Sequence, residues 1–201
     1  MVPVFNYFGV PARGEATRVA LAVAGVEFVD KIIPYAELHA SGFRAVPVYQ
    51  LDGTNYTQST ALLRYAGKLG GTYPEDPLEA LKVDEIVMMV EDVFINIFAD
   101  MKEKDEAKKL ATHQALIADK VKYLIEDIAS KLEANTASPF CVGPSLTIAD
   151  IMVHAMIATF QAGFLVGVPT TTAEDICPSL KDLDDAVMEH PKVKAYYASK
   201  A

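Results

Sequence analysis

The sequence predicts an α/β domain at the N-terminus, followed by a domain made entirely of helices. Up to about residue 73, short apolar segments, turn signals and helical segments follow the order β-α-β, a connection, and β-β-α. After the proline-bearing segment 74–78, apolar residues recur at helical spacing almost to the C-terminus. We therefore predict domains over residues 1–73 and 79–201, joined by a linker at 74–78.

The first domain is predicted to contain four strands and two helices. A strand-helix-strand start of this kind usually has parallel strands joined by a right-handed crossover. Gly25 stands where a cap would end the first helix, and Asp52-Gly53 is a strong hairpin signal between the last two strands. The predicted strands cover 2–7, 27–33, 46–51 and 55–57, and the predicted helices cover 15–25 and 58–70.

The second domain is predicted to contain three long helices and two short ones. Its best-defined helix start is at Thr147, because Thr147 and Asp150 can each bond the other's backbone N–H in a capping box. Leu146 and Ile151 can add a hydrophobic staple. We interpret Thr147 and Asp150 as residues that shape the fold and have no chemical role. The predicted helices cover 78–101, 107–134, 147–164, 179–188 and 191–199.

Composition and charge exclude some classes of function. The chain has 201 residues, of which 51% are hydrophobic and 22% are charged, so a folded protein is expected. Its formal net charge of -9 argues against nucleic-acid binding, which needs clustered lysine and arginine. Residues 1–73 are close to neutral, whereas the remainder is strongly acidic. A small anionic ligand is therefore expected to bind to the first domain.

The cysteines, histidines and apolar runs predict no disulfide framework, metal site or membrane segment. There are two cysteines, Cys141 and Cys177, no CxxC motif, and four scattered histidines that we interpret as ordinary core or surface residues. The apolar run 19–25 resembles the core of a signal peptide. Charged residues and a predicted strand precede it, so we interpret it as part of a buried helix. We expect a cytoplasmic protein that binds no metal, nucleic acid or membrane.

Five sequence motifs occur in a fixed order along almost the whole chain. They are Tyr7 with Arg13-Gly14-Glu15 after it, Val46-Pro47-Val48, Leu51-Asp52-Gly53, Gln58-Ser59 ahead of Arg64-Tyr65, and Leu146-Thr147-Ile148-Ala149-Asp150. In this order and spacing the chain resembles the cytosolic glutathione S-transferase family. Residues 13–15 and 83–92 are most similar to the sigma class of that family. The resemblance implies a thioredoxin-like first domain that binds glutathione as a substrate, with no metal.

Tyr7 and Arg13 are the catalytic residues that the resemblance implies. The phenol O–H of Tyr7 would donate a hydrogen bond to the glutathione sulfur, and Arg13 would add positive potential near it. Without the resemblance, Tyr7 is an ordinary tyrosine at the rim of a strand. Arg13 could equally form a salt bridge with Glu15 or with the second domain.

Val46, Pro47, Gln58 and Ser59 are the residues implied to hold the peptide. A cis Pro47 would turn the backbone of Val46 outward, so that an extended peptide can pair with it. The helix start at Gln58-Ser59 would attract the γ-glutamyl carboxylate, and the Ser59 hydroxyl would donate to it. The alternatives are a trans Pro47 at a strand edge, and Ser59 or Thr57 serving only as the helix cap.

The sequence departs from the family pattern where the glycine carboxylate of glutathione would bind. The family normally supplies a tryptophan and a lysine there, but the segment before the proline is shorter than in the sigma-like pattern and the chain has no tryptophan. Ala45 stands where the family usually has glutamine or lysine. Arg44 is our candidate for this carboxylate, and His39 or Lys31 could also substitute.

Asp92 and four apolar residues complete the implied site. In the family, an acid on the first helix of the second domain reaches across a homodimer to the glutathione amine, and Asp92 fits that position. The alternative is one more acid on an acidic helix. Phe8, Val10, Phe94 and Phe98 are candidates for the pocket of the hydrophobic electrophile, although all four could belong to the core.

Three functions remain open on the sequence alone. The first is a dimeric sigma-class transferase that conjugates glutathione to hydrophobic electrophiles, with a role in detoxification. The second is a glutathione-dependent isomerase similar to prostaglandin D synthase. The third is a binding or structural protein of the same fold with little activity, as in lens crystallins. The missing tryptophan and lysine favour the third, whereas Tyr7, Pro47 and Gln58-Ser59 oppose it.

Overall fold

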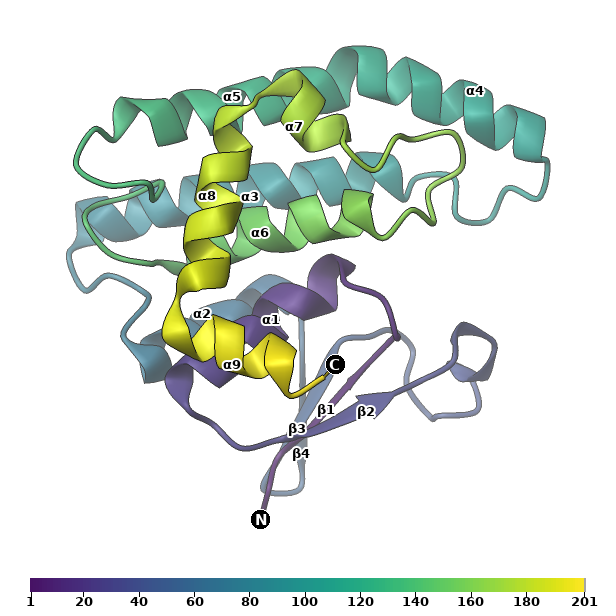
Figure 1. The fold of residues 1–201 in the computed structure, drawn as a ribbon. Helices are drawn as coiled ribbons and strands as arrows, with labels where there is room; N and C mark the ends of the chain where they lie inside the picture. Colours follow the sequence, from purple (N-terminus) through teal and green to yellow (C-terminus); the bar gives the residue numbers. More distant parts are fainter. Residues whose placement is uncertain (201) are drawn as a thin grey trace.

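A four-stranded mixed sheet forms the base of the molecule, and helices cover one of its faces (Figure 1). The structure is a computed structural model that describes residues 1–200. The strand order is β2-β1-β3-β4, with β1 parallel to β2 and antiparallel to β3, and β3 antiparallel to β4. The strands are β1 (Val4–Tyr7), β2 (Val29–Ile32), β3 (Val48–Leu51) and β4 (Thr54–Thr57). The β-α-β-β-β-α order and the parallel first pair confirm the predicted fold class of this part.

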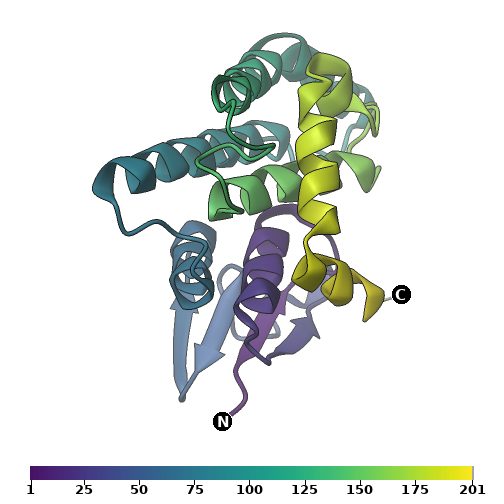
Figure 2. The ribbon, with the colours of Figure 1, turned by 60° about the vertical axis from the view of Figure 1, so that its left-hand side comes forward.

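Helix α1 (Ala12–Ala24) lies between the sheet and the helical part of the chain, beside α2 (Ser59–Gly70) (Figure 2). Because α1 is covered on several sides, its small and apolar residues are nearly all buried, as predicted for the run 19–25. Gly25 ends this helix in the left-handed region at φ 72°, which a glycine adopts without steric cost. In α2, Leu62, Leu63 and Ala66 are buried, whereas Tyr65 and Leu69 are exposed.

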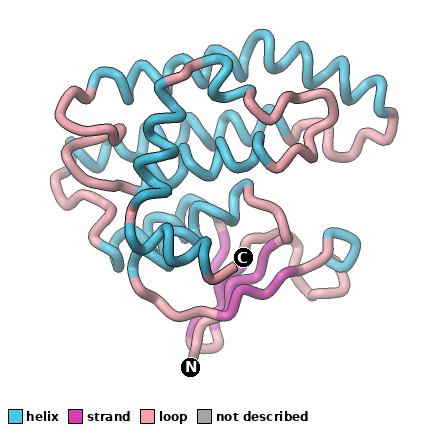
Figure 3. The backbone as a smooth tube through the Cα atoms, viewed as in Figure 1, coloured by secondary structure: helices cyan, strands magenta, loops and turns pink. Residues whose placement is uncertain are grey.

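The rest of the chain is helical, which confirms the predicted all-α region (Figure 3). One π-helical stretch interrupts the predicted helix 107–134, and α7 was not predicted because its five residues are too short for a helical period. Helix α3 begins at Pro77, inside the predicted linker. None of the helices within residues 1–200 is long and apolar enough to cross a membrane. The elements are α3 (Pro77–Ile97), α4 (Glu106–Leu116), η2 (Ile117–Val121), α5 (Lys122–Ala134), α6 (Ile148–Gln161), α7 (Thr172–Ile176), α8 (Ser179–Glu189) and α9 (Pro191–Ala198).

Helix α6 is the centre of the helical part, and the capping box predicted for its start is present. Asp150 is fully buried and accepts hydrogen bonds from the backbone N–H groups of Cys141 (2.6 Å) and Thr147 (2.7 Å). The Thr147 hydroxyl donates to the same carboxylate at 2.8 Å. Burial raises the pKa of Asp150, and these hydrogen bonds oppose that rise. One side chain therefore fixes both the helix start and the loop before it.

Replacement of Asp150 by alanine should destabilise the protein by about 3 kcal/mol, because three buried donors lose their acceptor. Chemical denaturation should show a lower midpoint. The exposed Asp119 offers a control, since Asp119→Ala removes an acid with no such contacts. Equal midpoints in the two variants would contradict the structural role given to Asp150.

The strand register places three chain segments at one edge of the sheet. Asn6 pairs with Val48, and Val48 pairs with Thr57. The end of β1, the start of β3 and the end of β4 therefore lie side by side. The residues just beyond these positions are Tyr7, the Val46-Pro47 pair and Gln58, which the sequence had singled out.

Candidate functional site

A groove of about 370 Å³ opens at this edge of the sheet. It is bordered by the loop before β3, the start of α2 and one side of α3. Six of the sequence-predicted site residues line it, namely Arg13, Arg44, Val46, Pro47, Gln58 and Ser59. The fold thus brings together residues that lie up to 46 positions apart in the chain.

The Val46–Pro47 peptide bond is cis, as predicted, so the trans alternative is wrong. Both residues line the groove. Pro47 is buried, whereas Val46 is only partly buried. The backbone of Val46 therefore lies at a surface that an extended peptide could pair with.

The start of α2 lies at the opposite wall of the groove. Gln58 is its N-cap, and no side chain among residues 1–200 bonds to the first-turn N–H groups. The alternative in which Ser59 or Thr57 only caps the helix is therefore not seen. Gln58 adopts φ 74°, a left-handed conformation that is costly for a residue with a side chain. Such a strained residue beside a helix N-terminus is typical of a site for an anion.

Tyr7 is not among the residues that line the groove, and only 5% of its surface is exposed. It is therefore no rim tyrosine. Burial raises the pKa of Tyr7 to about 12, although Arg13 and then Arg18 lower it through their positive charge. The phenol accordingly keeps its proton at neutral pH and can act as a hydrogen-bond donor. Gly14 packs directly against the Tyr7 ring.

Arg13 forms a salt bridge with the helical domain, which was one of the alternatives for it. Its Nε lies 2.5 Å from Oε1 of Glu91, on α3. The guanidinium also lies over the rings of Phe94 and Phe98, at 5.7 and 5.6 Å from their centres. Glu91 lines the groove, and among the described residues its other oxygen has no hydrogen-bond partner. The only sequence signal for Glu91 was its position next to Asp92.

Asp92 does not join this groove in its own chain. Its side chain is exposed on α3, and its backbone carbonyl accepts a hydrogen bond from Asn96. The sequence analysis had assigned Asp92 to the glutathione site of a second copy of the chain.

The predicted glycine end of the site is less complete. Arg44 is exposed and lines the groove. Lys31 and His39 are exposed but do not belong to the lining. Phe43 and Asn55 do line it, and no sequence motif had indicated them.

The four candidates for a hydrophobic pocket differ in exposure. Phe94 has no exposed surface and belongs to the core. Phe98 is partly buried and stacks on Phe94 and on Phe164, the latter with ring planes 5° apart. Phe8 is partly buried against the ring of Tyr7, with ring centres 5.3 Å apart, and Val10 is also partly buried.

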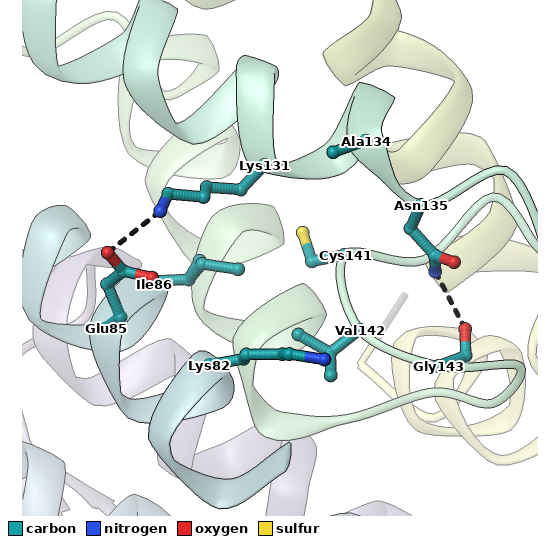
Figure 4. A pocket seen from close by; sticks show the side chains of 9 residues that line it. All are labelled: Lys82, Glu85, Ile86, Lys131, Ala134, Asn135, Cys141, Val142 and Gly143. Atoms are coloured by element: carbon teal, nitrogen blue, oxygen red, sulfur yellow. Dashed lines mark hydrogen bonds and ion pairs between the residues drawn. The ribbon is translucent and has the colours of Figure 1, made fainter. Parts of the chain in front are cut away.

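A second hollow, of about 300 Å³, lies in the helical domain between α3, α5 and the loop before α6 (Figure 4). Lys131 faces Glu85 across its mouth at 2.9 Å, so these two charges satisfy each other. Burial raises the pKa of the Cys141 thiol well above its ordinary value, which leaves it protonated and unreactive. None of the sequence-predicted site residues lies in this hollow.

Comparison with known proteins identifies a family. Residues 91–200 match the model of the glutathione S-transferase C-terminal domain. Glutathione S-transferase A of Cavia porcellus is 33% identical over 177 residues, covering 81% of this chain and 78% of that protein. Glutathione S-transferase 2 of Manduca sexta is 28% identical over 200 residues, covering 98% of this chain and 95% of that protein.

Among solved structures, the prostaglandin synthase D of Nilaparvata lugens shares the fold over the full chain. Its TM-score is 0.87 at 23% identity, with 100% of this chain and 99% of that chain covered. The fold, the domain match and the similarity to the Cavia porcellus protein agree with one another. The chain belongs to the glutathione S-transferase family.

Proposed function

We propose that this protein conjugates the glutathione thiolate to hydrophobic electrophiles and activates the thiol with Tyr7. The observation that carries the proposal is the groove at the edge of the sheet. There a cis Val46–Pro47 peptide and the uncapped start of α2 line one groove, and the buried Tyr7 ends the strand that pairs with β3. A tripeptide with an anionic end and a thiol matches these three features.

Thiol activation is the energetic problem that such an enzyme solves. A free thiol with pKa ~8.5 is only roughly 3% ionised at pH 7. Lowering that pKa by about two units corresponds to about 2.7 kcal/mol. Tyr7 supports this role because burial keeps its proton in place, so its O–H can donate to the sulfur anion. Arg13 and Arg18 add positive potential on the same side.

The start of α2 is the proposed site of the γ-glutamyl carboxylate. Replacement of Ser59 by alanine removes one donor and should raise the glutathione KM about tenfold, with little change in kcat. Steady-state kinetics with varied glutathione measure both quantities. The matched control is Ser130→Ala, which removes an exposed hydroxyl on α5, outside the groove. Equal KM values in the two variants would contradict the assignment of Ser59.

Arg44 is the proposed partner of the glycine carboxylate, since it is the only one of the three sequence candidates that lines the groove. A single exposed arginine in place of the family's tryptophan and lysine implies weaker glutathione binding than in relatives that have both.

A homodimer is part of the proposal. Exposed apolar side chains follow one stripe of α3, at Leu81 (63% exposed), Met88 (44%) and Ile95 (54%). Asp92 lies on the same stripe, because it stands four residues after Met88 and three before Ile95. A second copy packed on this stripe would bury the apolar side chains and could bring its Asp92 to the glutathione amine.

Introducing a charge into the stripe should dissociate the dimer. Met88→Lys is expected to halve the mass measured by sedimentation and to raise the glutathione KM, because the partner's acid is lost. The control is Leu110→Lys, on the exposed side of α4. A wild-type chain that sediments as a monomer and is fully active would contradict the dimer.

The direct test of the proposed function is an assay with a chloronitrobenzene and glutathione. We expect conjugation by the purified chain. The sigma-like motifs at residues 13–15 and 83–92 favour a prostaglandin endoperoxide as a second assay substrate, which would reveal an isomerase. Failure to bind to immobilised glutathione and absence of both activities would indicate a structural protein of the same fold.

A further inference from the structure

A buried string of polar groups joins the helical domain to the first domain. The hydroxyl of Tyr197, in α9, lies 2.9 Å from Oε1 of Glu15, in α1, and 2.7 Å from Nε2 of His154, in α6. His154 Nδ1 lies in turn 2.6 Å from Oδ1 of Asp184, in α8. Four helices therefore meet at one continuous set of contacts, and Tyr197 is its middle member.

The number of protons in the string fixes the direction of its hydrogen bonds. Each of the three contacts needs one proton, and Tyr197 supplies only one of them. The Tyr197 hydroxyl gives its one proton to the Glu15 carboxylate, so the contact with His154 needs a proton on Nε2. Tyr197 then donates to Glu15 and accepts from His154. The tyrosine hydroxyl is thus a required donor to the Glu15 carboxylate.

Glu15 connects this string to Arg18, whose side chain binds the loop that follows Tyr7. Arg18 is almost fully buried, and its guanidinium donates to the carbonyl oxygens of Phe8 (2.9 Å) and Val10 (3.3 Å). These residues form the loop that follows Tyr7. The guanidinium also lies 5.4 Å from the centre of the Tyr7 ring. Arg18 is therefore in contact with both the ring and the loop.

The charge of Arg18 is offset by two carboxylates. Glu15 Oε2 lies 3.4 Å from Arg18 Nη1, and Asp30 Oδ1 lies 3.0 Å from Arg18 Nε. Lys200 in turn faces the other oxygen of Asp30 at 3.1 Å. Tyr197 and Arg18 thus contact different oxygens of the same Glu15 carboxylate.

We propose that Tyr197 is a positioning residue for the thiol-activating site and acts through Glu15 and Arg18 on Tyr7. The inference rests on the proposed function, because it assigns a role toward the same tyrosine. Without the Tyr197 hydroxyl, Glu15 turns more fully to Arg18. The guanidinium then shifts from the loop carbonyls, and less of its positive charge acts at Tyr7.

Tyr196 provides a control that differs by one position. Its hydroxyl is buried and has no hydrogen-bond partner among the described residues, and its ring packs on that of Tyr197 at 5.0 Å. Tyr197→Phe and Tyr196→Phe each remove one hydroxyl from adjacent rings of the same helix. Only the first removes a link of the string.

The test compares both variants with the wild type in steady-state kinetics and in a pH titration of the bound thiolate by its ultraviolet absorbance. For Tyr197→Phe we expect kcat to fall about tenfold, the glutathione KM to change by less than about twofold, and the thiolate midpoint to move up by about one unit. Tyr196→Phe should match the wild type in all three. A role confined to stability would lower the melting temperature of Tyr197→Phe and leave the thiolate midpoint in place.

Asp184→Asn is a second variant at the partly exposed end of the string. It should move the thiolate midpoint in the same direction by a smaller amount. An active wild type in which Tyr197→Phe and Tyr196→Phe share one midpoint would overturn this inference and leave the proposed function intact. A wild type that forms no thiolate and no conjugate would overturn both.

Discussion

Replacement of Tyr7 by phenylalanine should lower kcat about 100-fold and leave the glutathione KM nearly unchanged. The factor follows from the loss of about two pKa units of thiol stabilisation, or about 2.7 kcal/mol. Glutathione binding should persist because the residues that line the groove remain in place. Steady-state kinetics and calorimetric titration with glutathione measure the two effects separately.

The same substitution should change the pH dependence of the reaction. In the wild type, burial raises the pKa of Tyr7 to about 12, so the phenol remains a donor throughout the neutral range. The rate should therefore rise with pH as the bound thiol ionises, and the midpoint should be about two units higher in Tyr7→Phe. Tyr123→Phe, on an exposed face of α5, is the control. A rate profile that is unchanged in Tyr7→Phe would exclude Tyr7 as the thiol activator.

Replacement of Gly14 by alanine should be nearly as damaging, because Gly14 determines where the Tyr7 ring lies. A Cβ at this position would be 2.5 Å from Cγ of Tyr7 and 2.6 Å from Cε1, and still closer to Cδ1. These atoms include the base of the ring, so the whole side chain has to move. We expect kcat to fall roughly 100-fold and stability to fall by about 1–3 kcal/mol.

Two further variants separate the loss of catalysis from the loss of stability. Gly67→Ala places a Cβ 2.5 Å from Cγ2 of Ile148, a clash of the same kind that does not involve Tyr7. It should lower the melting temperature while the folded enzyme keeps its kcat. In a Tyr7→Phe background, Gly14→Ala should reduce kcat far less than in the wild type. Additive effects of Gly14→Ala and Tyr7→Phe would argue against a shared role.

Much of the fold followed from local sequence signals. The hairpin at Asp52-Gly53, the cap at Gly25 and the capping box at Thr147 each depend on residues close together in the chain, and the structure contains all three. The helix α7 and the π-helical stretch at 117–121 were missed. The first is too short to show a period, and the second has the same apolar spacing as the helices on either side of it.

The candidate site could be predicted only in part, because some of its contacts join residues that lie far apart in the chain. Pro47 and Ser59 were identified through the motifs that the chain shares with the glutathione S-transferase family. Glu91 and Phe43 line the groove because of tertiary packing, and no local sequence pattern indicates such a position. His154 was interpreted as an ordinary histidine, because its contacts with Asp184 and Tyr197 join positions 30 and 43 residues away.

A crystal structure of the protein soaked with glutathione tests the central claim most directly. We expect the cysteinyl backbone of glutathione to pair with Val46 and the γ-glutamyl carboxylate to contact the start of α2 at Ser59. The sulfur should lie within hydrogen-bond distance of the Tyr7 hydroxyl. Glutathione bound outside the groove, or bound in it with the sulfur away from Tyr7, would contradict the account.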